Sequence, residues 1–173
     1  MPFTTPTRRF TFDDLLALLA FLVLCFGVAA IGGGFSETSM DTWFSTLGKP
    51  SFNPPGWVFG PVWTVLYALM AVAAWRVWRR AGFQAGRGAL SIFGVQLALN
   101  LAWPLIFFGL RRIDLAVVCI MALWVAIAAT IAAFRRIDRW AACLLVPYLA
   151  WVSFAAVLNM AIWHLNWGGE VIK

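Results

Sequence analysis

Five long apolar runs dominate the sequence, and their length constrains the fold more than any other feature. Crossing the hydrocarbon core of a bilayer takes roughly twenty helical residues. Because a backbone in lipid must satisfy its own hydrogen bonds, each run is expected to be a helix. The runs are Leu15–Ile31, Trp57–Trp75, Leu90–Leu110, Ile113–Phe134 and Trp140–Trp163. Short links between the later runs make neighbours antiparallel, so the sequence predicts an all-α integral membrane protein built as a five-transmembrane-helix bundle.

We expect one membrane domain with a tail at each end. The three parts are an N-terminal tail (1–14), the membrane domain (15–163) and a C-terminal tail (164–173). Within the domain, Gly32-Gly33-Gly34 closes the first run, and the prolines of Lys49–Pro55 disfavour helix. Residues 33–56 are therefore expected to form an outer loop that covers the bundle as a lid.

The composition also indicates a lipid environment. The chain is 63% hydrophobic and 12% charged, with a mean hydropathy of +0.86, whereas soluble domains are about one quarter charged. The net charge of +6 does not indicate nucleic-acid binding, because the basic residues form short clusters between apolar runs. Membrane lipid is thus an expected partner, and nucleic acid is not.

Lysine and arginine counts predict the orientation of the bundle. With the N-terminus inside, nine of the thirteen Lys and Arg residues fall in inner segments and four in outer ones. The positive-inside rule therefore favours an inner N-terminus and an outer C-terminus, and helical runs of this length favour the bacterial inner membrane. Asp13 and Asp14 precede the first run, where a signal peptide rarely carries acids, so we expect no cleavage there.

The sequence offers little for metal binding, catalysis or ion-coupled transport. Cys25, Cys119 and Cys143 lie in apolar runs without metal-binding spacing. No Asp or Glu lies in the middle of a run, where a proton- or sodium-coupled carrier usually needs one. His164 ends the last run, and no Ser/His/Asp or Cys/His set is evident. We therefore expect no metal, no obligatory cofactor and no catalytic residue.

Aromatic and polar side chains inside the runs indicate a pocket. Trp63 and Tyr67 lie four residues apart and so share a helix face. On the next run, Gln96 and Asn100 have the same spacing, and Trp103 follows about one turn later. Polar groups at membrane depth are costly, so they face the protein interior and often mark a site.

The last run supplies a third wall. Trp151, Ala155 and Asn159 follow one another at four-residue intervals. Aromatic walls with an amide suit a flat, largely apolar ligand that is oriented by one or two hydrogen bonds. In a second interpretation, Gln96, Asn100 and Asn159 only join helices through hydrogen bonds. Spacing alone leaves both interpretations open.

Small residues recur along two runs. They are Gly94 and Ala98 in the third run, and Ala122, Ala126, Ala129 and Ala133 in the fourth. Such stripes let helices approach closely. They serve either packing within the bundle or the face of a homodimer.

Three segments resemble a known family. KPSFNPPGWVFGPVWTVLYALM, ALNLAWPLIFF and LLVPYLAWVSFAAVLN are similar to motifs of the TspO/translocator-protein family, the tryptophan-rich sensory proteins once called peripheral benzodiazepine receptors. The resemblance extends from the first run to Asn159. It implies a five-helix bundle, often a homodimer, whose pocket lies under the loop between the first two helices. That pocket is expected to bind porphyrins, haem and synthetic isoquinoline or benzodiazepine ligands.

The resemblance also implies which residues contact the ligand. By motif they are Trp63, Tyr67, Asn100, Trp103, Trp151 and Ala155. The lid of the family corresponds to Pro50, Pro54, Pro55 and Trp57.

The chain departs from the family pattern in two places. Relatives credited with sterol binding carry a tyrosine and then an arginine shortly after the position of Asn159. Here that stretch is Met160-Ala161-Ile162-Trp163-His164, so sterol binding is not inherited from the resemblance. Phe52 stands where some relatives have a tryptophan, which is expected to alter lid closure.

These observations together predict a membrane receptor or sensor. It would bind haem or protoporphyrin IX in an aromatic pocket between helices and regulate tetrapyrrole metabolism, stress responses or transport. Two alternatives remain: a light- or oxygen-dependent porphyrin-degrading enzyme, and a passive carrier of tetrapyrroles or lipids.

Overall fold

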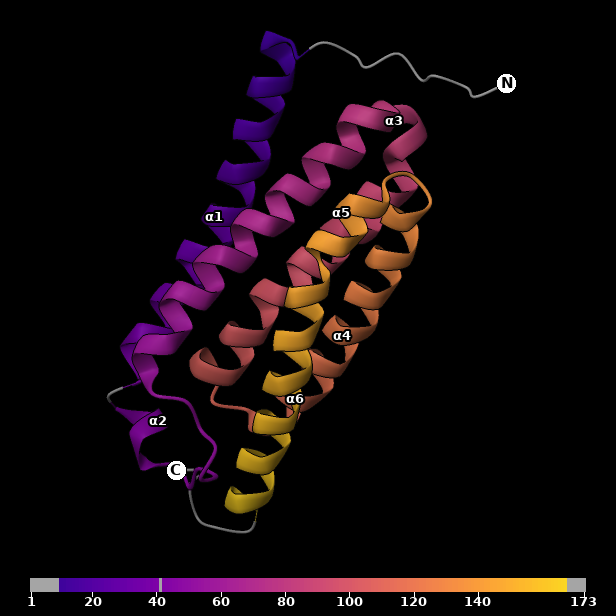
Figure 1. The fold of residues 1–173 in the computed structure, drawn as a ribbon. Coiled ribbons are helices and arrows are strands. Elements are labelled where there is room, and N and C mark those ends of the chain that lie inside the picture. The colour runs from indigo at the N-terminus through magenta and orange to yellow at the C-terminus, as the bar shows by residue number, and fades with distance from the viewer. Residues whose placement is uncertain (1–9, 41, 168–173) are drawn as a thin grey trace.

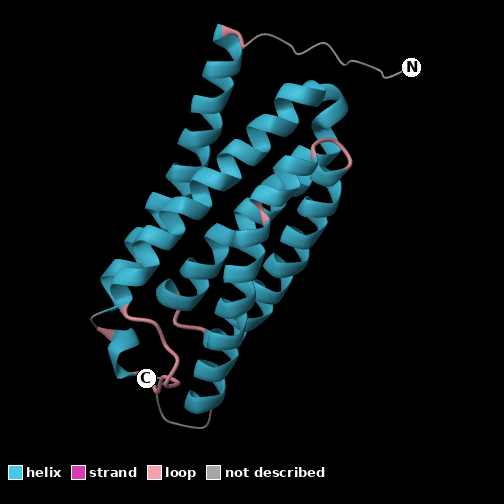
Figure 2. Cartoon of the chain, viewed as in Figure 1, coloured by secondary structure: helices cyan, strands magenta, loops and turns pink. Residues whose placement is uncertain are grey.

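The protein is described by a computed structural model that covers residues 10–40 and 42–167. Every regular element in this part of the chain is helical. Figure 2 shows that loops and turns gather mainly at the two ends of the bundle. The predicted all-α fold class is confirmed.

Five crossings make up the bundle, as predicted from the five apolar runs. Helix α1 (Phe12–Met40) is the first crossing, and α4 (Ile113–Arg135) is the fourth. Helix α3 (Phe59–Pro104) provides two crossings, because Gly82 breaks its backbone with φ 66° and ψ −174°. Short α5 (Arg139–Leu144) and α6 (Val146–Asn166) together form the fifth. Pro147 lies in the first turn of α6 and explains the interruption.

The described chain begins at one end of the bundle and finishes at the other. Figure 1 shows α1 packed beside the first arm of α3, with α4 and α6 on the other side of the second arm. The break in α3 and the turn between α4 and α5 lie at one end, whereas α2 (Trp43–Thr46) lies at the other. An odd number of crossings therefore separates the two ends of the described chain.

The predicted start of the lid at residue 33 is wrong, because α1 continues through the three glycines to Met40. Hydroxyl groups reinforce this part of the helix: Ser36 Oγ donates to the carbonyl of Gly32 at 3.0 Å. A backbone surrounded by lipid gains from remaining helical until it reaches the interface. The connection to α3 is correspondingly shorter and contains α2 and the single 3₁₀ turn η1 (Gly56–Val58).

The link expected between the second and third crossings is also mostly helical. Only Gly82 departs from helical geometry between Trp75 and Leu90. A glycine adopts positive φ without steric cost, so it allows two helices to meet with almost no loop.

Buried carboxylates fasten the helices at the end where α3 breaks. Asp138 caps α5 by accepting a hydrogen bond from the backbone N–H of Trp140 at 2.8 Å. Its other oxygen lies 2.9 Å from a guanidinium nitrogen of Arg76 and 3.2 Å from one of Arg80. On α1, the buried carboxylate of Asp14 lies 3.6 Å from Arg79. The acids therefore lie at helix ends, as expected, and bind arginines at the end of the bundle where α3 breaks.

Candidate ligand-binding cavity

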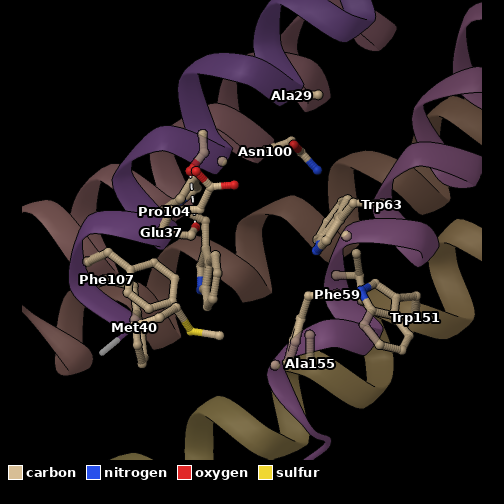
Figure 3. Close-up of a pocket in the computed structure, with 18 of the residues that line it drawn as sticks. Ala29, Glu37, Met40, Phe59, Trp63, Asn100, Pro104, Phe107, Trp151 and Ala155 are labelled. Carbon is tan, nitrogen blue, oxygen red and sulfur yellow. Dashed lines mark hydrogen bonds between the residues drawn. The ribbon is translucent and has the colours of Figure 1, made fainter. Parts of the chain in front are cut away.

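A large cavity opens within the bundle at the end that carries α2. Its volume is about 460 Å³, which falls within the range of small-molecule sites. Its walls come from α1, both arms of α3, α4, α6 and the π-helical turn η2 (Leu105–Gly109). Figure 3 shows Phe59, Trp63, Trp151 and Ala155 on one side of this cavity and Glu37, Met40 and Phe107 on the other.

All six residues predicted to contact ligand line this one cavity. They are Trp63, Tyr67, Asn100, Trp103, Trp151 and Ala155. They come from three crossings, as their spacing predicts, and so the structure brings them together. Their contact with a ligand stays a prediction.

Aromatic rings make most of the wall. The rings of Trp63 and Tyr67 have centroids 5.6 Å apart. Trp103 stacks on Phe107, one helical turn later, at 5.0 Å and an interplanar angle of 23°. Phe59 meets Trp151 edge-on at 5.9 Å. These contacts hold the rings as fixed flat surfaces on which another flat, apolar ring can stack.

Asn100 is the centre of a buried hydrogen-bond network. Its Oδ1 accepts a hydrogen bond from the hydroxyl of Tyr67. Its Nδ2 donates to the hydroxyl oxygen of Tyr148 at 2.7 Å. An amide oxygen has two lone pairs and an amide nitrogen has two hydrogens. One acceptor site and one donor site of Asn100 therefore remain for a ligand.

A second amide joins helices at the edge of the cavity. Asn159 Oδ1 accepts from Trp103 Nε1 at 2.9 Å, and its Nδ2 lies 3.5 Å from the carbonyl oxygen of Ile113. Gln96 is buried but does not line the cavity, and its Nε2 lies 3.9 Å from Met70 Sδ. The two interpretations of the amides thus combine: Asn100 and Asn159 join helices and also line the cavity, whereas Gln96 only joins the two arms of α3.

Trp151 presents a polar group that the described protein does not satisfy. Its Nε1 is buried and has no hydrogen-bond partner among the described residues, although the indole lines the cavity. Leaving a buried donor unpaired costs about 1–3 kcal/mol. A carbonyl or carboxylate oxygen on a ligand would remove that cost.

The predicted lid contributes less to the cavity than expected. Of its four named residues only Trp57 lines the cavity; Pro50, Pro54 and Pro55 do not. Trp57 is 77% exposed. Phe52 packs against Phe154 of α6 at 6.4 Å, so the residue that departs from the family pattern anchors the connection to the last helix.

Sequence reasoning missed the wall that α1 provides. Its residues include Ala29, Gly33 and Glu37, and also Gly32, Ser36 and Met40. Both sets repeat every four residues, which is the spacing of one helix face. This four-residue repeat is visible in the sequence, but it extends past Gly32-Gly33-Gly34, where the apolar run was expected to end.

The described residues contain no group of three His, Cys, Asp or Glu side chains that could hold a metal ion. Cys25 and Cys119 are buried, Cys143 is exposed, and all three are free thiols. The cavity therefore offers ring surfaces and hydrogen-bonding groups, with no set of side chains arranged for acid–base chemistry among the residues described.

Comparison with known proteins identifies the family. The profile of the TspO/MBR family matches residues 21–164, which is most of the chain. The chain belongs to the TspO/MBR family.

Individual relatives agree with this assignment. A tryptophan-rich sensory protein of Cereibacter sphaeroides is 42% identical over 89% of this chain and 94% of its own length. The human translocator protein is 41% identical over 80% of this chain and 83% of its own length. Protein CrtK of Rhodobacter capsulatus is 35% identical over 92% of this chain and 98% of its own length. Membership of the TspO/MBR family and the long apolar helices together establish that this chain is an integral membrane protein.

Proposed function

We propose that this TspO/MBR protein is a membrane receptor or sensor for porphyrins such as haem and protoporphyrin IX, and for related flat apolar ligands. In this role it would regulate tetrapyrrole metabolism, stress responses or transport. The observation that supports the proposal best is the cavity itself, whose fixed indole rings surround an unpaired indole N–H. The names of the relatives, which refer to sensing and to translocation, are consistent with it.

The proposed binding mode uses rings and one or two hydrogen bonds. Trp63, Trp103 and Trp151 supply stacking surface for the ligand plane. Asn100 is held in one orientation by Tyr67 and Tyr148, so its remaining donor and acceptor sites are preorganised for the edge of a ligand. No group in the cavity needs to change protonation state for this mode.

The test is a titration of the purified protein with protoporphyrin IX, followed through tryptophan fluorescence. Trp63→Ala and Trp151→Ala each remove a stacking surface. We expect each to raise the Kd obtained from saturable quenching about tenfold, equivalent to about 1.4 kcal/mol. Trp140→Ala is the matched control, because Trp140 is 57% exposed and does not line the cavity. Quenching that does not saturate, and is alike in all four proteins, would mean that the porphyrin only partitions into detergent.

One observation also favours the enzymatic alternative. Trp63 and Tyr67 are both oxidisable and lie side by side on the cavity wall, where an excited porphyrin would contact them. Illumination in air separates the cases: bleaching that stops after one equivalent of porphyrin indicates a side reaction, whereas repeated turnover indicates an enzyme.

We also propose the bacterial inner membrane, with the N-terminus inside. The support is the unequal distribution of lysine and arginine. The residues Arg76, Arg79 and Arg80 gather at the end of the bundle where α1 begins. That end would then face the cytoplasm, and the cavity would open toward the outer face.

A further inference from the structure

Among the residues that the structure describes, Glu37 alone lines the cavity with a carboxylate. It projects from the last turns of α1, is exposed, and lies across the cavity from Trp151 and Ala155 (Figure 3). Among the described residues, no lysine, arginine or histidine lines the cavity. The cavity therefore has a negative edge without a matching positive one.

Two basic side chains from the segments that follow the first and third crossings, Lys49 and Arg112, bind other groups. Lys49 donates hydrogen bonds to the carbonyl oxygens of Ser45 and Leu47 at 3.0 and 3.1 Å, and lies over the ring of Phe44. Arg112 pairs with Asp114 at 2.6 Å. The ion pairs of the described residues join arginines to Asp14, Asp114 and Asp138, and none of them includes Glu37.

Two hydroxyl groups that line the cavity also present hydrogen-bond acceptors to it. Ser36 Oγ donates its hydrogen to the Gly32 carbonyl, and Thr64 Oγ1 donates to the Gly60 carbonyl at 2.9 Å. Each therefore faces the cavity with lone pairs and no free hydrogen. The unpaired donor, Trp151 Nε1, is on the opposite wall. The α1 side of the cavity therefore presents the Glu37 carboxylate and the lone pairs of Ser36, whereas the opposite wall presents the unpaired N–H of Trp151.

We propose that Glu37 sets the charge selectivity of this cavity. It disfavours ligands that carry a carboxylate at the α1 side and favours ligands whose edge there is neutral or cationic. A porphyrin diacid would accordingly bind with its carboxylates turned away from α1, toward the Trp151 side or toward solvent. This inference rests on the proposed function, since it concerns ligands of the same cavity.

The experiment compares two ligands that share one ring. Protoporphyrin IX carries two carboxylates, and its dimethyl ester carries none. Both are titrated into wild type and Glu37→Gln in a nonionic detergent at low salt. We expect Glu37→Gln to bind the diacid about 3- to 10-fold more tightly than wild type does. The reason is that the substitution removes the repulsion between Glu37 and the two ligand carboxylates, which is modest at a site exposed to water. The affinity for the dimethyl ester is expected to stay within about twofold of wild type, because it presents no charge to repel.

Two further variants and a salt series make the result specific. Asp13→Asn removes the same charge from the other end of α1, about 36 Å away along the helix, and is expected to change neither affinity. Glu37→Lys should strengthen diacid binding beyond Glu37→Gln. High salt should narrow the difference, because ions screen exposed charges.

The outcomes separate the two proposals. Equal affinities of wild type and Glu37→Gln for the diacid, or equal effects of Glu37→Gln and Asp13→Asn, would overturn charge selection while leaving porphyrin binding in place. Saturable binding of neither porphyrin to wild type would overturn the proposed function and this inference with it.

Discussion

At the scale of single residues, the three-membered network of Tyr67, Asn100 and Tyr148 decides how the cavity is held. All three side chains are buried, and the two hydrogen bonds between them connect the second, third and fifth crossings. A buried polar group that loses its partner costs more than the bond itself contributed, whereas removing every partner can be nearly neutral.

This asymmetry gives a prediction about stability. Asn100→Leu should lower the unfolding free energy by about 2–4 kcal/mol, because two buried hydroxyls lose their partner at about 1–2 kcal/mol each. The triple variant that adds Tyr67→Phe and Tyr148→Phe should recover most of that loss. Thermal unfolding in detergent measures both, and a triple variant less stable than Asn100→Leu would contradict the role assigned to the network.

The same residues show what sequence can predict at this scale. Spacings of three and four residues placed Trp63, Tyr67, Asn100 and Trp103 on inward faces correctly, because the period of a helix is fixed. It did not predict that Tyr148 completes the bonds of Asn100, since that depends on how helices from distant parts of the chain are rotated about their axes. Nor did it predict that Trp151 keeps an unpaired N–H.

At the scale of elements, α1 determines whether the cavity has a fourth wall. A Cβ on Gly32 would lie 3.1 Å from Cγ of Pro104, closer than most carbon contacts. The pyrrolidine ring is rigid, so α1 approaches the second arm of α3 because residue 32 has no side chain. Apolar run length could not reveal this, because the contact joins residues far apart in the sequence.

The close approach predicts that a side chain is harmful at Gly32 but tolerated at Gly34. Gly32→Val should push α1 away from Pro104, lower the midpoint of thermal unfolding and weaken porphyrin binding at least about threefold, since overpacking typically costs 1–3 kcal/mol. Gly34→Val is the control on the same helix, because nothing lies within 4 Å of a Cβ placed there. If both variants bound and unfolded alike, the contact with Pro104 would not be what positions the wall.

Errors at this scale shared one cause. The glycines at 32–34 and the end of the apolar run at Trp75 both resemble the ends of helices in soluble proteins. In lipid, unsatisfied backbone groups cost several kcal/mol each, so helices continue through such residues until the interface. Gly82, with its positive φ, is the only true break between the second and third crossings.

At the scale of the whole molecule, the cavity is complete within one chain. The residues that line it lie on the five crossings and on the connection between the first two, which contains α2 and η1, so we expect that porphyrin binding does not require a second copy. The expected homodimer would then form on an outer face. Gly94 and Ala98 are both exposed on the second arm of α3, and a Cβ at Gly94 would meet nothing within 4 Å. Helices in membranes associate through small residues with this spacing.

We therefore propose the face with Gly94 and Ala98 as the dimer contact, and expect Gly94→Leu to reduce the dimer fraction measured by light scattering in detergent. Bulk at that position separates two backbones that must approach closely. Gly88→Leu is the matched control, since Gly88 is also exposed, with nothing within 4 Å of its Cβ position, on the same arm. The affinity of monomeric Gly94→Leu for protoporphyrin IX should stay within about twofold of wild type, because Gly94 does not line the cavity and its substitution removes no contact with the ligand. A monomer that no longer binds would show that the partner completes the cavity, and a dimer that survives Gly94→Leu would move the contact to another face.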